Sequence, residues 1–355
     1  MKIHQLTLKN FRNYEQLELL FKEGANVFVG QNGQGKTNVL EAISLFSVGR
    51  SFRTVRDLDM VAFGQDAATV SAIVENLHGR YTIDMKLGKS IKKAVKINSV
   101  PIEKLQDLFG VLNIVVFSPD DLKLVKDGPK ERRLFLDREI SQLKPRYYRI
   151  LSEYYKVLNQ RNTLLKQEVD EVLLEIYTQQ IAKSGFQIHK MREEFIEHIR
   201  EFAQEIHSKI SSKKEVLEIE YEPNVYAISE EEYFRYLMDG KEHDFIRKHS
   251  TRGIHKDDVA LVINEMDIRH FGSQGQKRSA AISLKLSEIQ MIYQDTGEYP
   301  IVLLDDIFSE LDYSRQRMLL DYVTNTQVFV TTAEKFLDNG KIYAVENGKI
   351  SVEEG

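Results

Sequence analysis

The segment of residues 30–38, GQNGQGKTN, combines closely spaced glycines with a lysine and a threonine. Gly30, Gly35, Lys36 and Thr37 fit the pattern G-x-x-x-x-G-K-[ST] of phosphate-binding loops. In such a loop the backbone N–H groups surround phosphate oxygens, the lysine reaches the β- and γ-phosphates, and the hydroxyl ligates Mg²⁺. The residues expected to hold a nucleotide are Gly30, Gln31, Asn32, Gly33, Gln34, Gly35, Lys36, Thr37 and Asn38.

A second candidate site lies in PIVLLDDIFSELD, residues 300–312. The apolar residues 301–304 indicate a buried strand that ends in two carboxylates. Asp305 is expected to hold Mg²⁺, and Asp306 to orient or deprotonate the attacking water, a role worth ~10²–10⁴-fold in rate. A strand that simply ends in acidic turn residues is the alternative. The phosphate-binding loop in the same chain favours the catalytic interpretation.

A third candidate site lies in FGSQGQKRSAAISLKLSE, residues 271–288, where small and polar residues precede a long helical pattern. Ser273, Gly275 and Gln276 would offer a second anion site at the positive end of the helix dipole. An ordinary Ser/Gly helix cap is the alternative. That alternative does not explain why the cap, the phosphate-binding loop and the acidic strand occur together.

The elements that must position these residues can be predicted from hydrophobic periodicity. Strands are expected at 3–8 and 16–21, at 27–29 before the loop, and at 113–117, with a hairpin around NLHG. A helix is expected over 39–47, where it follows the loop directly, so a chance glycine-rich turn is a weak alternative. Further expected elements are a strand in DDVALVI, a helix in SAAISLKLSEIQMIY, strands in YPIVLLDDI and TQVFVTTAE, and a terminal hairpin turning at Asn347-Gly348.

The middle of the chain has a different character. Between Pro145 and Pro223 there is no proline and a single glycine, Gly185, and apolar residues recur at spacings of three and four. This pattern predicts two or three long amphipathic helices in a compact lobe. The predicted fold is α/β: residues 1–140 and 251–355 form one nucleotide-binding head with a mixed β-sheet, and residues 141–250 form an inserted helical lobe.

Composition narrows the classes of function. The chain of 355 residues has a formal net charge of -5 and no cysteine, which excludes disulfide scaffolds and thiolate metal sites. The sequence contains no run of about 18 apolar residues, so no membrane span is predicted. The start of the sequence lacks the features of a signal peptide. We expect a cytoplasmic protein. Because the chain is not basic overall, nucleic acid would have to bind at a local patch.

The order of the motifs resembles an ABC-type ATPase head of the SMC-like kind: phosphate-binding loop, S-x-G-Q before a helix, and a buried strand with two acids followed by SELD. More narrowly, the chain resembles the RecF family of bacterial recombination mediators from its first strand to about Thr332. The strings that carry this resemblance are FRNY, GQNGQGKTNVLEAI, GRSFRT, FSPDDLKLVKDGPKERRLFLD, TRGIHKDD, GSQGQKRSAAISLKL and LLDDIFSELD.

The resemblance implies a weak, DNA-linked ATPase that uses ATP and Mg²⁺ and dimerises on ATP at gapped or junction DNA. It implies RecO- and RecR-like partners, loading of the RecA recombinase, replication restart, and a nucleoid-associated role in the SOS response to DNA damage. The family's Walker A and Walker B positions are matched by Lys36, Thr37, Asp305 and Asp306. Its signature serine is matched by Ser273, and Asp312 falls in the D-loop that contacts the partner's site.

Several positions depart from the general ABC pattern. Asp306 stands where most such heads carry Glu, so its shorter side chain predicts slow turnover. Gln274 replaces the usual Gly of the signature. Thr331 and Thr332 replace the switch His, and a hydroxyl can bond a γ-phosphate but cannot become a cation. No convincing Q-loop glutamine is present.

Three groups of basic residues are candidates for phosphate contacts with DNA, although each could also be an ordinary solvated face. They are Arg50, Arg53 and Arg56; Lys89, Lys92, Lys93 and Lys96; and Lys123, Lys126, Lys130, Arg132 and Arg133. For the segment TRGIHKDD, a structural hydrogen-bond cluster and a DNA contact are both open.

Three other classes of function compete with the repair ATPase. The ATPase subunit of another ABC-type machine, such as a membrane transporter, would not normally carry so long a helical insertion. A small-molecule kinase would not need the signature-like helix cap. An SMC-like structural clamp would need a longer arm, because about 75 residues folded back at 1.5 Å each reach only ~50 Å.

Overall fold

The computed structural model describes residues 1–54, 56–89, 92–167, 170–334 and 340–353. The chain divides into two compact units, the first formed by Met1–Asp121 with Lys285–Gly355 and the second by Leu122–Leu284. The first unit therefore combines both ends of the chain. The second unit begins before and ends after the predicted lobe of 141–250, because elements on both sides of that range contact its helices and strands.

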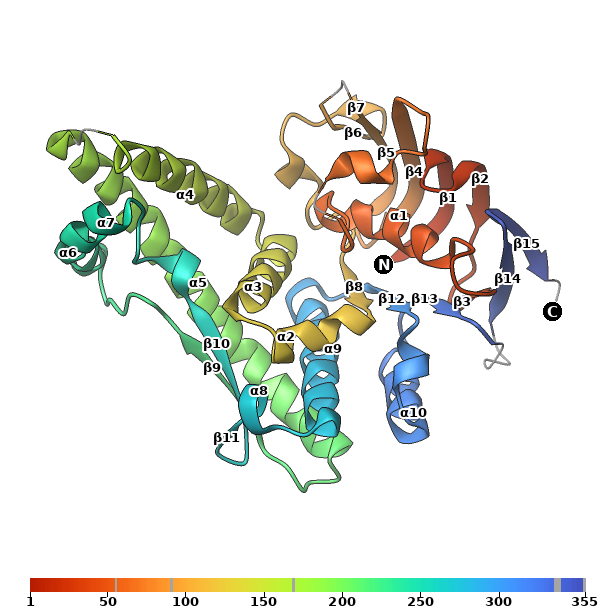
Figure 1. The fold of residues 1–355 in the computed structure, drawn as a ribbon. Coiled ribbons are helices and arrows are strands. Elements are labelled where there is room, and N and C mark those ends of the chain that lie inside the picture. The colour runs from red at the N-terminus through yellow and green to blue at the C-terminus, as the bar shows by residue number, and fades with distance from the viewer. Residues whose placement is uncertain (55, 90–91, 168–169, 335–339, 354–355) are drawn as a thin grey trace. The chain divides into compact units, whose positions relative to one another are not determined.

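One sheet of the first unit is antiparallel and has six strands in the order β2-β1-β4-β5-β6-β7 (Figure 1). Its strands are β1 Lys2–Phe11, β2 Tyr14–Leu20, β4 Ala67–Asn76, β5 Gly79–Gly88, β6 Ala94–Ile97 and β7 Val100–Pro101. The strands expected at 3–8 and 16–21 are confirmed as β1 and β2, which pair antiparallel with Phe11 opposite Tyr14. The predicted hairpin around NLHG is confirmed as well, with Asn76 opposite Gly79.

The other sheet of the first unit has the order β15-β14-β3-β13-β12-β8 and is parallel except for the last hairpin. Its strands are β3 Ala25–Val29, β8 Ile114–Phe117, β12 Ile301–Asp305, β13 Val328–Thr332, β14 Lys341–Glu346 and β15 Lys349–Glu353. Strands from both ends of the chain thus share one sheet. Parallel neighbours end at the same edge, so the loop after β3 and the acids after β12 meet there.

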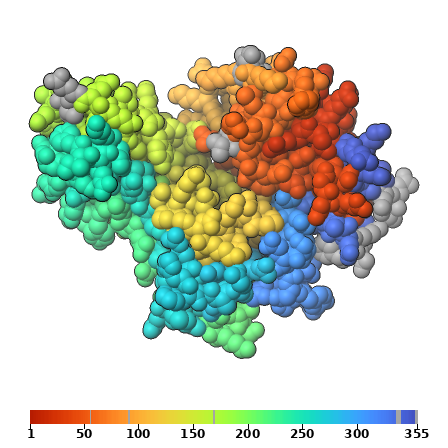
Figure 2. Space-filling model, in the orientation of Figure 1, coloured from red at the N-terminus to blue at the C-terminus, as the bar shows by residue number. Residues whose placement is uncertain are grey.

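Helix α1, Lys36–Val48, follows the phosphate-binding loop and contacts strands of both sheets. Apolar residues lie on all sides of α1, which is typical of a helix buried between layers. The other helical elements of this unit are η1 Asp57–Met60, η2 Leu105–Leu108, η5 Ile307–Glu310 and α10 Tyr313–Tyr322. Helix α9, Gln274–Thr296, belongs to this unit from Lys285 onward. In the space-filling view, residues of the N-terminal strands and of the C-terminal hairpin lie next to each other (Figure 2).

The second unit is built on helices α4 and α5, which pack against each other along the chain's middle (Figure 1). Its elements are α2 Lys123–Lys126, α3 Pro129–Leu143, α4 Pro145–Leu164, α5 Glu171–Ile210, β9 Leu217–Glu222, α6 Glu230–Asp239, α7 Lys241–Arg247, η4 Ile254–Lys256, β10 Asp258–Ile263, β11 Met266–Asp267 and α8 Ile268–Phe271. Element η3, Pro119–Leu122, spans the boundary between the units. Proline at the first position starts α3 and α4, and Asp170 caps α5 by accepting from Leu173 N–H.

A buried arginine organises this second unit. Arg192 of α5 is fully buried and donates to Tyr147 Oη at 3.0 Å, to Asp137 Oδ1 at 2.8 Å and to Asp257 Oδ2 at 2.8 Å. Asp257 also accepts from the Tyr221 hydroxyl at 2.5 Å. A buried charge of this kind is tolerated because each guanidinium nitrogen donates a hydrogen bond and two carboxylates oppose the charge. The network joins α3, α4, α5 and β9.

Hydrogen bonds within the second unit also account for the histidine and the two aspartates at the end of the segment TRGIHKDD. Asp258 accepts two hydrogen bonds from the Arg132 guanidinium, at 2.6 and 2.9 Å. His255 Nδ1 lies 2.8 Å from Tyr154 Oη, and burial lowers the pKa of His255 to about 4, so the ring is neutral at pH 7. Of the two alternatives for this segment, the structure shows the hydrogen-bond cluster.

Candidate functional site

The loop between β3 and α1 has the backbone of a phosphate-binding loop. Gly33 and Gly35 adopt positive φ angles of 83° and 114°, a conformation that L side chains rarely adopt. A Cβ on Gly35 would also lie 2.5 Å from Asn13 Nδ2. The glycines therefore let the chain enter α1 with its first N–H groups unencumbered, which is the arrangement that binds anions at a helix N-terminus.

Lys36 bends back over this loop. Its Nζ donates to Gly30 O at 2.5 Å and to Gln31 O at 2.9 Å, and the residue is only 6% exposed. Burial lowers the pKa of Lys36, while the negative charges of Asp306 and Asp305 oppose that shift. The ammonium thus sits among carbonyl oxygens that a bound phosphate group would outcompete as an acceptor.

The Asp305 carboxylate connects three elements at the edge of the parallel sheet. Its Oδ1 accepts from the Thr37 hydroxyl at 2.7 Å and from the Thr331 hydroxyl at 2.8 Å. Burial raises the pKa of Asp305, although these two hydrogen bonds and the charge of Arg53 oppose the rise. Thr37 and Asp305 are predicted to hold Mg²⁺, and the structure brings their two hard oxygen donors together at a largely buried carboxylate. That donor set fits Mg²⁺.

Asp306 follows at the end of β12 in a left-handed backbone conformation, with φ at 50°. Its N–H donates to Thr331 Oγ1 at 2.9 Å, and its carbonyl accepts from Ser309 Oγ at 2.8 Å. Such a conformation costs free energy in a residue with a side chain, and such residues cluster at functional sites. No hydrogen bond from any residue described in the structure reaches the Asp306 carboxylate, which leaves it available to water.

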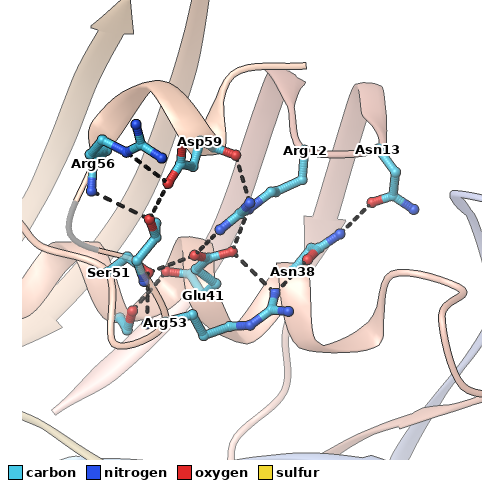
Figure 3. Close-up of polar contacts among 10 residues, drawn as sticks. Arg12, Asn13, Asn38, Glu41, Ser51, Arg53, Arg56 and Asp59 are labelled. Carbon is cyan, nitrogen blue, oxygen red and sulfur yellow. Dashed lines mark hydrogen bonds and ion pairs between the residues drawn. The ribbon is translucent and has the colours of Figure 1, made fainter. Parts of the chain in front are cut away.

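A polar cluster beside the loop connects α1 to residues of two strings of the sequence, FRNY and GRSFRT (Figure 3). The Glu41 carboxylate is fully buried and accepts from Arg12 Nε at 2.8 Å, Arg12 Nη2 at 2.6 Å and Ser51 Oγ at 2.6 Å. Arg53 donates to Asn38 Oδ1 at 2.9 Å and reaches Glu41 Oε2 at 3.4 Å. Arg53 is therefore tied to the nucleotide-binding segment rather than being a simple surface cation.

Residues far from the loop in sequence brace it from the side, and the motifs had assigned them no role. Asn13 Nδ2 and Gly348 N–H both donate to the carbonyl of Gln34, at 3.1 and 3.3 Å. Asn347 N–H donates to Gln34 Oε1 at 2.5 Å, and the Tyr14 hydroxyl donates to Gly35 O at 3.1 Å. The string FRNY and the Asn-Gly turn were visible signals, but their contact with the loop depends on strand order.

The signature residues lie in the second unit, whereas Lys36, Asp305 and Asp306 lie in the first. Ser273 is exposed and caps α9: its Oγ accepts from Gln276 N–H at 3.2 Å, and its own N–H donates to Gln276 Oε1 at 2.9 Å. Gly275 lies in the first turn of α9. The structure therefore shows the helix cap. Because the cap is exposed, an anion could reach it, and the anion site stays a prediction.

Asp312, predicted in the D-loop, caps α10. Its carboxylate accepts from Ser314 Oγ at 2.6 Å and from Arg315 N–H at 3.0 Å, and it pairs with the Arg315 guanidinium. The Ser314 hydroxyl and the Arg315 backbone hold the pKa of Asp312 at about 2, so the carboxylate is charged at pH 7.

The structure separates exposed basic residues from structural ones. Arg132 is 5% exposed and pairs with Asp258, so it cannot belong to a DNA-contacting patch in this conformation. Lys93 donates to Gly49 O at 2.6 Å and pairs with Asp57 at 2.7 Å. The candidates that remain exposed are Arg50, Arg53, Arg56, Lys89, Lys92, Lys96, Lys123, Lys126 and Lys130, of which Arg53 also contacts Asn38 and Glu41.

The two sheets, the loop before α1 and the paired residues Thr37 and Asp305 define an ABC-type ATPase head of the SMC-like kind. Residues 2–348 match the family model RecF/RecN/SMC N terminal domain. The Smc head bound to the C-winged helix domain of ScpA shares this fold, with a TM-score of 0.59 at 18% identity over 99% of this chain and 97% of that one. The predicted fold class is confirmed.

The chain belongs to the RecF family. It is 44% identical to the DNA replication and repair protein RecF of Clostridioides difficile (strain 630) over 100% of both chains. It is 40% identical to the protein of that name from Clostridium novyi (strain NT), over 99% of this chain and 100% of the relative. The solved structure of the recombination mediator protein RecF-ATP in the RecFOR pathway matches with a TM-score of 0.94 at 33% identity, over 99% of this chain and 97% of that one.

No helix among residues 1–54, 56–89, 92–167, 170–334 and 340–353 is long and apolar enough to cross a bilayer.

The raised pKa of Asp305 makes a prediction about stability without ligand. Because burial disfavours its charge, Asp305→Asn should raise the melting temperature at pH 7–8, where the parental carboxylate is ionised. As the pH falls through the raised pKa, the parental carboxyl becomes neutral and the difference should vanish. Differential scanning calorimetry from pH 8 down through this pKa measures the difference in melting temperature. Asp321→Asn, an exposed change in α10, is the control. A lower melting temperature for Asp305→Asn at pH 7–8 would contradict the assignment.

Proposed function

We propose that this chain is a DNA-binding ATPase of DNA replication and recombinational repair. The observation that carries the proposal is the contact between Thr37 and Asp305, which joins the phosphate-binding loop to the acidic end of β12. Relatives at 44% and 40% identity are named DNA replication and repair protein RecF, and a solved relative at 33% identity is RecF-ATP. ATP is therefore the nucleotide that we assign to residues 30–38.

The roles of individual residues follow from their positions. Loop N–H groups and Lys36 bind the β- and γ-phosphates, and Thr37 and Asp305 hold Mg²⁺, which supplies charge neutralisation at the phosphates when bound. Asp306 orients the attacking water and takes its proton. Thr331 donates to Asp305 and accepts from the Asp306 N–H, so it keeps the two acids in register. The short side chain of Asp306 makes this a slow ATPase.

The site in one chain is incomplete in this proposal. Ser273 caps a helix of the second unit, and its exposed position allows it to meet the γ-phosphate bound to Lys36 of a second copy. Two ATP molecules would then be enclosed between two heads. The cap gains its anion only in the dimer, so ATP favours association through contacts that the monomer lacks. Asp312, charged and exposed, would lie at the same interface.

The biological setting is the recombination-mediator pathway. ATP-dependent dimers would assemble at single-stranded/double-stranded junctions or gaps, act with RecO- and RecR-like mediators, and help load RecA. DNA contacts through exposed cations would be independent of base sequence and sensitive to salt. The proposed location is the cytoplasm, on the nucleoid.

Nucleotide binding and hydrolysis should depend on different residues. Lys36→Ala should largely abolish ATP binding, because the β- and γ-phosphates lose their cation. Asp306→Asn should bind ATP like the parent but lose turnover by about 10²-fold or more, since an amide cannot take the proton of water. Fluorescent-ATP titration and phosphate release separate the two effects. Hydrolysis at the parental rate by Asp306→Asn would remove Asp306 from the mechanism.

The two-headed site makes a second prediction. Ser273→Arg places a bulky cation at the predicted interface, so ATP should still bind through Lys36 and Thr37 while dimerisation and hydrolysis both fall. Analytical ultracentrifugation with a non-hydrolysable ATP analogue measures the first loss. Lys190→Ala, an exposed change on α5, is the control. Normal dimerisation and turnover by Ser273→Arg would exclude the two-headed mechanism.

Exposed arginines near the loop make a third prediction. Neutralising Arg50 and Arg56 should weaken duplex binding equally on unrelated sequences, and the slope of log K against log salt should shrink by about 0.9 per lost phosphate contact. Arg53 stays unchanged in this test because it is tied to Asn38 and Glu41. Fluorescence anisotropy over a salt series measures the slope. An unchanged slope would transfer the contact to the exposed lysines Lys123, Lys126 and Lys130.

A further inference from the structure

A chain of polar side chains supports the start of the signature helix from behind. Gln276 uses its Oε1 to accept from Ser273 N–H, and its Nε2 donates to Glu215 Oε1 at 3.0 Å. The two ends of an amide differ, so Gln276 can accept from Ser273 only in one orientation. Glu215, an acceptor without any hydrogen, selects that orientation. In the flipped orientation, an NH₂ group would face the Ser273 N–H.

Glu215 is itself held in place. Its Oε2 lies 3.1 Å from Nε2 of His207, which is fully buried near the end of α5. His207 Nδ1 lies 3.2 Å from Ser283 Oγ, and the Ser283 hydroxyl donates to Ser279 O at 2.7 Å. The two ring nitrogens of His207 thus contact Glu215 on one side and Ser283 on the other, which fixes the ring between them.

The backbone around Glu215 is also supported. Glu215 N–H donates to Ser211 Oγ at 3.3 Å, and Val216 N–H donates to Asn264 Oδ1 at 2.9 Å. Two residues of this turn, Ser212 and Lys213, adopt positive φ angles of 53° and 62°. The turn between α5 and β9 therefore holds a specific, strained path that delivers one carboxylate to the signature helix.

We propose that Glu215 is a positioning residue for the signature cap. It fixes the Gln276 amide, and Gln276 in turn fixes the N–H and hydroxyl of Ser273, the group that meets the γ-phosphate of a second copy. The inference rests on the proposed function, because it concerns the same two-headed site. The inference adds that α5 contacts that cap indirectly, because His207 of α5 holds Glu215 and Glu215 holds Gln276.

A charge swap tests this contact. Gln276→Glu keeps the Ser-x-x-Glu form of a capping pair but places a carboxylate against Glu215, so ATP-dependent dimerisation should weaken about tenfold. Glu215→Gln alone loses one of its two acceptors and should also weaken dimerisation. Combining Glu215→Gln with Gln276→Glu restores an amide-to-carboxylate hydrogen bond with its ends exchanged, and the amide oxygen remains available to His207. Dimerisation should return toward the parental value.

The readout is sedimentation with a non-hydrolysable ATP analogue, together with ATP affinity at protein concentrations that keep the chain monomeric. ATP affinity should stay at the parental value in every variant, because Lys36 and Thr37 lie in the other unit. Glu218→Ala is the matched control: this glutamate is exposed on β9, three residues from Glu215, and should change neither quantity. A variant that loses its fold would lose ATP affinity as well, whereas a displaced cap changes dimerisation alone.

The outcomes distinguish the inference from the function on which it rests. A parental chain that fails to dimerise with the analogue overturns both. If the parent dimerises and Ser273→Arg does not, parental dimerisation by Gln276→Glu overturns only the role of Glu215. A swapped double variant that stays as weak as the single variants overturns it as well. Rescue by the swap, with unchanged ATP affinity throughout, supports it.

Discussion

The candidate site depends on one buried carboxylate. Asp305 ends a strand whose other residues are all apolar, and burial raises the pKa of its carboxyl group. Among the described residues, two hydroxyl groups donate hydrogen bonds to this carboxylate. Those hydroxyls come from α1 and β13, which means that three segments of the first unit converge on one oxygen. A divalent cation at this point would relieve the cost and replace hydrogen bonds by ligation. The same geometry that disfavours the charge in the free state would therefore favour binding of a nucleotide with its metal, as proposed.

Buried charges organise the two units in similar ways. In the first unit, the fully buried Glu41 binds Arg12, Ser51 and Arg53, and so fixes the segment after α1 against the N-terminal hairpin. In the second unit, the fully buried Arg192 binds Asp137 and Asp257. Removing one partner from such a pair would leave an uncompensated charge, which typically costs about 3–5 kcal/mol. These clusters therefore specify how neighbouring elements meet, whereas their net contribution to stability is small.

The division into two units separates the parts of one proposed reaction. The first unit carries the phosphate-binding loop and both acids, and the second carries the signature cap. In the proposed mechanism this separation gives a physical basis for coupling: one unit would bind the nucleotide, and the cap of the other would gain from it only when two chains associate. The supports of the cap, Glu215 and His207, belong to the second unit, so its geometry can be tuned without altering the bound phosphates.

Local features were predictable because they depend on short stretches of chain. The strands, the long helices and the glycine loop before α1 each follow from periodicity or spacing within about 20 residues, and the ABC-type fold follows from the order of the motifs. The limits of the second unit were not predictable in this way. Helix α3 and strand β10 lie largely or wholly outside the predicted range and join the unit through contacts with α5 and β9, and no pattern within either element indicates that partner.

Residue types and spacing alone predicted the chemistry of the candidate site: Gly35 for a left-handed turn, which the structure shows, Lys36 for phosphate, Thr37 and Asp305 as oxygen ligands, and Asp306 as the adjoining acid. Which of these groups are in contact became visible in the folded chain alone. Thr37 and Asp305 are 268 positions apart and meet because β3 and β12 both pair in parallel with β13. Only the tertiary structure also showed that Arg132 is buried and that Glu215 supports Gln276. Such contacts depend on which distant strands pair and on which charges become buried. Neither can be read from residue types and local spacing.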